Sequence, residues 1–357
     1  MDLPPGPNGL HNRWNLSLNW GHCSGPQCPL RDNLLKCGAC RVVMYCGGAH
    51  QRAHRPQHKS SCIFIKDARA KLAKEEAALR VRPGDDFLME NPFETARGRF
   101  YKFLPTRPYM FARHELISTL LNIKTGEAVE EALNHCLDML RLNPGDNQGI
   151  RSHVAGLFLR LGRDQEAYDY IKWQGTIGAA SDYDWNNPGS TYLNLHDEDA
   201  FEPVSDFAKK ISDLSTLVCL VNFKVRLLLD IKVLDKESKK PGNRNASYDK
   251  KMEWVREHVV CEALYKRRDI IERSEWTDII ASLQSQAKEV FDIVNDRNKY
   301  YWPALRSPDR YAAALPVPYS PGSPQEINIV FRNTWYSWAE SPPAIELVRT
   351  WRATRRT

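Results

Sequence analysis

The chain has 357 residues, of which 42% are hydrophobic and 26% are charged, and its net charge is +6. A chain of this length and composition can bury a sizeable core, and we expect about two domains. Residues 1–14 are rich in proline and glycine and lack an apolar core, and the most hydrophobic stretch, 214–229, is interrupted by Lys224 and Arg226. We therefore expect neither secretion nor a membrane span, and no membrane partner.

The first predicted element is a cluster of potential metal ligands that contains six of the nine cysteines. The ligands form four closely spaced pairs, namely Cys23/Cys28, Cys37/Cys40, Cys46/His50 and His58/Cys62. Zinc is bound tetrahedrally when local pairs of thiolates and imidazoles aim at one ion, so four pairs predict two structural zinc ions. The three-residue gap in the last two pairs predicts side chains one helical turn apart. Buried or disulfide-bonded cysteines are the alternative, which the interspersed histidines disfavour.

Residues 23–62 resemble the MYND zinc finger, a module whose two ions are bound in an interleaved, cross-braced order. The resemblance implies a first zinc site formed by Cys23, Cys28, Cys46 and His50 and a second formed by Cys37, Cys40, His58 and Cys62. Two positions depart from the family pattern: the first pair is wider than usual, and His50 stands where most members have cysteine. His22 and His54 lie close by, but the four pairs are complete without them, so we expect neither to be a ligand.

The finger region also carries an excess of positive charge. Residues 1–62 contain seven Lys or Arg and two Asp or Glu. Six ligand thiolates and two zinc ions would lower this net charge of +5 to about +3. Arg52, Arg55 and Lys59 are not interleaved with aromatic side chains on which bases could stack. We interpret these residues as a solvated basic face, and nucleic-acid binding is the alternative.

After the finger the sequence predicts helices almost throughout, so the predicted fold class is mainly α. The alanine- and lysine-rich stretch 67–82 predicts a connector helix, which Pro83 and Gly84 end. The aromatic-rich segment 86–111 is expected to be irregular and packed on a larger body. Periodic apolar residues between Val129 and Leu140 then predict an amphipathic helix.

Two further helices are predicted at 154–161 and 164–171. The phrases Leu-x-Leu-Asn-Pro, which ends at Pro144, and Leu-Gly-Arg-x2-Glu-Ala, which ends at Ala167, resemble tetratricopeptide repeats. The resemblance implies a repeat-like (TPR-like) helical body. A generic array of helical hairpins is the alternative.

The C-terminal half is predicted to be helical as well. Residues 211–234 are apolar on nearly all sides, which predicts a helix buried between neighbours. Residues 235–251 have the composition of a flexible loop, and helical patterns resume at 254–270 and 279–294. The tail is rich in proline and tryptophan, and we expect it to pack on the helical body.

These elements predict seven segments along the chain. They are a flexible start (1–22), the finger (23–62), a connector helix (63–84), a TPR-like helical domain (85–232), a flexible loop (233–251), C-terminal helices (252–306) and a packed tail (307–357).

The sequence does not indicate an enzyme. MYND fingers occur within SET-class lysine methyltransferases and beside prolyl hydroxylases, but neither partner domain is visible. An iron site would need two histidines and a carboxylate on a β-barrel, and the nearest candidates, His196, Glu198 and His258, lie in sequence with a helical pattern. No phosphate-binding glycine loop or paired nucleophile and base is recognisable. We therefore expect no catalytic residue and no cofactor besides zinc.

We expect an adaptor or scaffold that binds other proteins through the finger and the helical array. The alternative is a nucleic-acid-binding or chromatin-associated transcriptional regulator, and an unrecognised enzyme is less favoured. Unpaired thiols and zinc thiolates favour a reducing compartment, the cytoplasm or the nucleus.

Proline-rich peptides are one class of partner that the resemblance implies. Corepressor-type MYND fingers bind such peptides in a shallow groove beside the second zinc. Gln51 matches one residue of that surface, whereas Arg55 stands where those fingers have a tryptophan that packs on the peptide. The tail segment 314–318 is an intramolecular candidate for the same groove.

Overall fold

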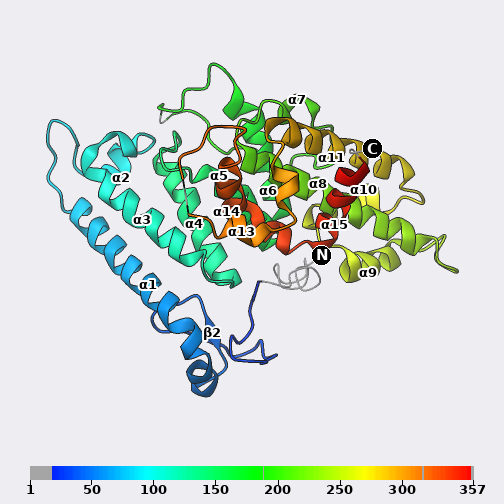
Figure 1. Ribbon diagram of the computed structural model, residues 1–357, viewed down its shortest axis with the longest axis horizontal. Coiled ribbons are helices and arrows are strands. Elements are labelled where there is room, and N and C mark those ends of the chain that lie inside the picture. The colour runs from blue at the N-terminus through cyan, green and yellow to red at the C-terminus, as the bar shows by residue number, and fades with distance from the viewer. Residues whose placement is uncertain (1–17, 188, 316, 355–357) are drawn as a thin grey trace. The chain divides into compact units, whose positions relative to one another are not determined.

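The structure is a computed structural model that describes residues 18–187, 189–315 and 317–354 (Figure 1). Within these residues the regular structure consists of fifteen α-helices, short 3-10 turns and one two-stranded sheet. The predicted mainly α fold is therefore confirmed. No helix of this part of the chain is both long and apolar enough to cross a bilayer.

The described chain divides into two compact units. The N-terminal unit contains residues 18–154 and 182–192, and the C-terminal unit contains residues 155–181 and 193–354. The division falls inside helix α5 (Arg151–Leu161). The predicted TPR-like domain at 85–232 is thus divided between the two units, and its repeat character stays a prediction.

The N-terminal unit contains the finger and the first helices. Strands β1 (Leu35–Lys36) and β2 (Met44–Tyr45) form an antiparallel pair. The helices are α1 (Gly48–Arg80), α2 (Pro92–Thr95), α3 (Arg107–Leu120) and α4 (Gly126–Leu142), with 3-10 turns at Phe100–Lys102 and Leu104–Thr106. Helix α3 packs against both α1 and α4 (Figure 1).

Helix α1 is longer than the predicted connector. It begins at Gly48, inside the finger, and continues to Arg80 without a break. The first turns carry metal ligands instead of periodic apolar residues, so hydrophobic periodicity does not reveal them. Pro56 lies within these turns and has no N–H to donate to the carbonyl of Arg52, which weakens the helix locally.

The aromatic-rich segment 86–111 packs only in part. The rings of Phe93, Phe100 and Tyr109 form a buried cluster with centroids 5.0 to 5.8 Å apart. Phe87 and Phe111, by contrast, are 82% and 51% exposed. The segment is also less irregular than predicted, since it contains α2, two 3-10 turns and the start of α3.

The C-terminal unit is built around one long buried helix, α8 (Leu214–Ser238). The others are α6 (Asp164–Gly175), α7 (Ser205–Ala208), α9 (Tyr248–His258), α10 (Arg268–Ile271), α11 (Thr277–Arg297), α12 (Tyr301–Ala304), α13 (Pro308–Ala312), α14 (Glu326–Ala339) and α15 (Pro342–Thr354), with 3-10 turns at Ile177–Ala179 and Glu262–Leu264. Helices α6, α9, α11, α14 and α15 all pack against α8.

Two predicted elements of this unit have different limits in the structure. The loop predicted at 233–251 is shorter, because α8 continues to Ser238 and α9 begins at Tyr248. The helix predicted at 254–270 ends at His258. The Asp230 carboxylate accepts hydrogen bonds from the backbone N–H groups of Val260 (3.1 Å) and Cys261 (2.7 Å), which removes these donors from any helical ladder.

The C-terminal tail forms helices that add to this core. Trp338 of α14 lies with its ring 6.0 Å from that of Trp302, and Trp351 of α15 lies 5.8 Å from Phe291. Both tryptophans are buried. The proline-rich sequence before α14 includes residue 316, so the predicted groove-binding segment 314–318 lies partly outside the described residues.

Lys224 and Arg226, the charges that interrupt the apolar stretch, are buried within the unit. Lys224 Nζ donates to the carbonyl oxygen of Ala200 at 2.7 Å and to Oε1 of Gln286 at 2.8 Å. Arg226 pairs with Asp164 at 3.1 Å. Both cations therefore keep polar partners in the core, which buried charges require.

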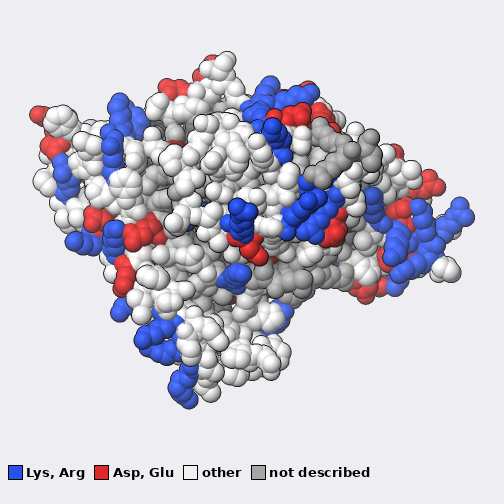
Figure 2. All heavy atoms as spheres, viewed as in Figure 1, with Lys and Arg blue, Asp and Glu red and all other residues white. Residues whose placement is uncertain are grey.

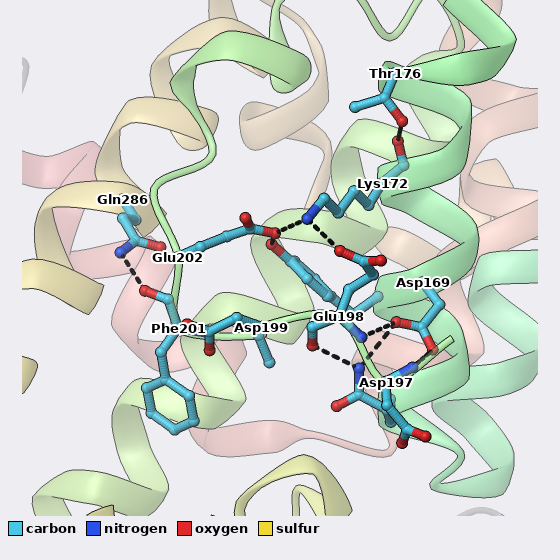
Figure 3. Close-up of polar contacts among 12 residues, drawn as sticks. Asp169, Lys172, Thr176, Asp197, Glu198, Asp199, Phe201, Glu202 and Gln286 are labelled. Carbon is cyan, nitrogen blue, oxygen red and sulfur yellow. Dashed lines mark hydrogen bonds and ion pairs between the residues drawn. The ribbon is translucent and has the colours of Figure 1, made fainter. Parts of the chain in front are cut away.

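The acidic loop 196–202 is held by side chains of α6 (Figure 3). The Asp169 carboxylate accepts the backbone N–H groups of Asp197 and Glu198 at 2.9 and 3.0 Å. Lys172 pairs with Glu198 and Glu202, each at 2.5 Å. These contacts engage Glu198, the carboxylate considered above as an iron ligand, so we assign the cluster a structural role.

Candidate metal centre and adjoining groove

The first set of metal ligands lies where the start of the finger meets the start of α1. The structure brings together Cys23, Cys28, Cys46 and His50. His50 Nδ1 is 3.0 Å from Cys46 Sγ and 3.5 Å from Cys23 Sγ, and the Sγ atoms of Cys28 and Cys46 are 3.9 Å apart. Cys46 precedes α1, so the predicted one-turn helical spacing of Cys46 and His50 is wrong.

The second set joins the loop after β1 to the middle of α1. It contains Cys37, Cys40, His58 and Cys62. Cys40 Sγ is 3.4 Å from His58 Nε2, and the Sγ atoms of Cys37 and Cys62 are 3.6 Å apart. His58 and Cys62 both lie within α1, one turn apart, as predicted.

Both sets have the donors and the spacing of tetrahedral zinc. Within each set the four donor atoms all lie within 4.8 Å of one another. Zinc bonds of about 2.3 Å to sulfur and about 2.0 Å to nitrogen place two sulfurs about 3.8 Å apart and a sulfur and a nitrogen about 3.5 Å apart. The observed separations scatter around these values. The two sets draw alternately on the chain, so the two zinc sites are cross-braced.

Backbone hydrogen bonds lower the pKa of one thiol of the first set, that of Cys23. Burial disfavours the Cys23 thiolate, but the N–H groups of Cys46 (3.3 Å) and Gly25 (3.4 Å) donate to its sulfur and, with His50, lower the pKa of Cys23 to about 7. Gly25 is required here, because an added Cβ would lie 2.5 Å from Cβ of His50. A thiolate that is stabilised in this way is suited to bind a metal cation.

The other histidines of interest do not join a metal set. His54 donates to or accepts from the Tyr45 hydroxyl through Nδ1 at 2.9 Å, and neither His54 nor His22 belongs to either set. In the part of the chain that the structure describes, the two finger sets are the only groups of three or more such residues placed to hold an ion. His196, Glu198 and His258 therefore form no iron site there.

The finger is fastened to the turn before α4 by backbone and side-chain contacts. The N–H of Asn19 donates to the carbonyl of Lys124, and the N–H of Gly126 donates to the carbonyl of Asn19, both at 2.8 Å. Thr125 Oγ1 donates to the carbonyl of Val42 at 2.5 Å. The Trp20 ring lies so close to Gly126 that an added Cβ would overlap it, at 1.4 Å.

Arg69 of α1 forms a second link between the finger and α4. Its Nη2 donates to the carbonyl of Cys40 at 2.9 Å, and its guanidinium pairs with Glu131 at 2.5 Å. The sequence gives no signal for this role, because an arginine on a polar helix face usually faces solvent. The contact connects a residue of the second zinc site directly to the helical part of the unit.

A groove of about 360 Å³ opens beside the second zinc site. One wall is the loop that contains Cys37, Gly38 and Ala39. The facing wall is α1, which contributes Gln51, Arg55, His58, Lys59, Cys62, Ile63 and Lys66. The predicted surface residue Gln51 and the divergent Arg55 thus both line this groove.

Comparison with protein families identifies the finger. Residues 22–62 match the family described as MYND finger. No curated protein and no solved structure matches the chain. The match coincides with the two cross-braced Cys and His sets, so residues 22–62 of this chain form a MYND finger with two structural zinc sites.

Proposed function

We propose that this protein is an adaptor or scaffold that binds other proteins through its MYND finger and the helices fastened to it. The observation that carries the proposal is the groove beside the second zinc site. Both of its walls contain zinc ligands, Cys37 on the loop and His58 and Cys62 on α1. Arg69 and Thr125 also donate hydrogen bonds to the backbone carbonyls of Cys40 and Val42, just after the loop wall. A preformed groove of this kind binds a partner without first paying an ordering cost.

The zinc ions are proposed to have a structural role and no catalytic one. Each set supplies four protein donors, which complete a tetrahedral shell and leave no position for water or substrate. The binding energy of the ions then contributes to folding of the finger. We also propose a reducing compartment, the cytoplasm or nucleus, since all nine cysteines are free of disulfides.

The test is an affinity purification with mass-spectrometric identification of bound proteins. The intact chain is compared with a Cys40→Ala, Cys62→Ala variant, each with and without nuclease treatment. Partners that are lost in the variant and retained after nuclease treatment support the adaptor function. A partner list that depends entirely on nucleic acid would favour the alternative, a nucleic-acid-associated regulator.

A control variant separates loss of the finger from loss of the whole protein. Cys136→Ala removes a buried cysteine of α4 that belongs to neither metal set. We expect this variant to keep the zinc content and the partner list of the intact chain. If the finger variant keeps every partner as well, the finger is not the binding surface.

A further inference from the structure

The groove beside the second zinc site is basic. Arg55, Lys59 and Lys66 line it, and no Asp or Glu does. Arg52 lies one turn before Arg55 on the same helix. At 3.6 residues per turn, positions 52, 55, 59, 63 and 66 fall on one stripe of α1. The stripe therefore presents four cations around one apolar residue, Ile63.

The cations of this stripe differ in their partners from three of the four other cations of α1; the fourth, Lys74, also forms no ion pair with a described residue. Arg69 pairs with Glu131, Lys71 with Glu115, and Arg80 with Glu76. The four cations of the stripe are exposed, and none of them forms an ion pair with a described residue. In Figure 2 the visible face of the finger, at the lower edge of the view, has Lys and Arg but no Asp or Glu.

Ile63 gives the groove an apolar contact. Its side chain is 45% exposed, although it lies on a helix whose buried face is well packed. Gly38 on the opposite wall has no side chain, and nothing lies within 4 Å of where its Cβ would be. The groove of about 360 Å³ thus has an exposed apolar side chain on one wall and a glycine on the other.

The lining favours a peptide over a nucleic acid or a proline-rich ligand. Single-stranded nucleic acids are usually held by aromatic side chains on which bases stack, and no Phe, Tyr or Trp lines this groove. Proline-rich segments likewise dock in aromatic-lined grooves. A partner with carboxylates and one apolar side chain matches both the charge and the apolar element that are present.

We propose that this groove binds an acidic segment of a partner protein. Carboxylates of the segment face Arg55, Lys59 and Lys66, and an apolar side chain of the segment contacts Ile63. The inference rests on the proposed adaptor function and names the chemistry of its partner. It also explains why an arginine at position 55 is compatible with peptide binding, since it supplies charge in place of an aromatic surface.

The test uses fluorescein-labelled peptides and the full chain with zinc bound. One peptide has a central leucine flanked by Asp and Glu, a second has Asn and Gln in place of these acids, and a third is a neutral Pro-x-Leu-x-Pro peptide. We expect the acidic peptide to bind at least about tenfold more tightly than the other two at physiological salt. We expect its affinity to fall as the salt concentration rises.

Paired charge reversals locate the site. Arg55→Glu with Lys59→Glu should weaken binding of the acidic peptide at least about tenfold. Arg31→Glu with Lys36→Glu makes the same change in charge on exposed finger residues outside the groove and should weaken it less than about threefold. Zinc content of two ions per chain verifies that each variant is folded. Arg55→Gln with Lys59→Gln, a milder change, should give an intermediate loss.

Three results would overturn the proposal. They are equal affinity for the acidic and amide peptides, equal losses in the two charge-reversal variants, and tighter binding of a single-stranded oligonucleotide than of the acidic peptide. The adaptor function is judged separately. If cellular partners are lost in the Cys40→Ala, Cys62→Ala variant but retained after charge reversal of the groove, the adaptor function stands and the acidic-segment proposal fails.

Discussion

Arg69 shows how one side chain can fix the position of a small domain. It is 27% exposed and contacts both the carbonyl of Cys40 and the carboxylate of Glu131. We predict that Arg69→Met lowers the free energy of unfolding by about 1 to 3 kcal/mol, because the Cys40 carbonyl loses its donor and the half-buried Glu131 carboxylate keeps only His135, 3.6 Å away. Urea unfolding of the zinc-loaded chain measures the change.

Lys71→Met is the matched control for this substitution. Lys71 lies on the same helix and also pairs with a carboxylate of a neighbouring helix, but its side chain is 52% exposed. Exposed ion pairs contribute little, so the expected loss is below about 1 kcal/mol. Equal losses in the two variants would show that Arg69 does not fasten the finger.

Gly126 and Trp20 form a second contact that a single substitution can test. An added Cβ at position 126 would overlap the Trp20 ring. We predict that Gly126→Ala destabilises the chain by about 1 to 3 kcal/mol, because the indole must move. In a Trp20→Ala background the same substitution should leave the free energy of unfolding unchanged, since the place of the indole ring is then empty. A double-mutant cycle gives this coupling, and additive effects would contradict the contact.

At the scale of elements, α1 combines two sources of stability. Its first turns carry His50, His58, Cys62 and the weakening Pro56, whereas its later turns bury Ile65 and other apolar residues. We predict that chelation of zinc unfolds residues 22–62 and leaves the later turns of α1 helical, because those turns pack against α3 independently of metal. Hydrogen exchange resolves the two parts. Loss of protection throughout α1 would contradict the prediction.

Zinc stoichiometry tests the assignment of the individual ligands. The intact chain should bind two zinc ions, and Cys46→Ala should lower the affinity of the first site by removing one of its four donors. His50→Cys should retain both ions, because a thiolate replaces an imidazole as the fourth ligand. His54→Ala should also retain both, because His54 contacts Tyr45 and lies in neither set. Loss of an ion from the His54 variant would require a different ligand set.

At the scale of the molecule, Lys224 makes the stability of the C-terminal unit dependent on pH. Burial lowers the pKa of Lys224 from 10.5 to about 7. Between pH 7 and pH 9 the unfolded chain binds this proton more strongly than the folded chain does. The free energy of unfolding therefore rises with pH in this window, by up to about 1.4 kcal/mol per pH unit.

Lys224→Met should remove this part of the pH dependence while lowering stability at pH 7, where the carbonyl of Ala200 and the amide of Gln286 lose a donor. Hydrogen exchange at the amides of α8 as a function of pH compares the two proteins. Parallel pH profiles for the intact chain and the variant would contradict a depressed lysine pKa in the folded state.

The candidate site was largely predictable from sequence because its chemistry is local. Cys37 and Cys40, or His58 and Cys62, are close in the chain, and zinc geometry restricts which residues can share an ion. The mainly α fold was predictable for a similar reason, since apolar periodicity is also local. The start of α1 was missed because its turns are specified by metal ligands, which have no hydrophobic period.

The amino-acid sequence by itself determined the two zinc sites and the helical character of the body. The tertiary structure alone decided which cations of α1 pair with carboxylates and which do not. Arg69 and Lys71 meet carboxylates that lie far away in the chain, whereas Arg55 and Lys59 do not. Charge pairing between distant residues depends on how helices pack, and no local pattern in the sequence reports it.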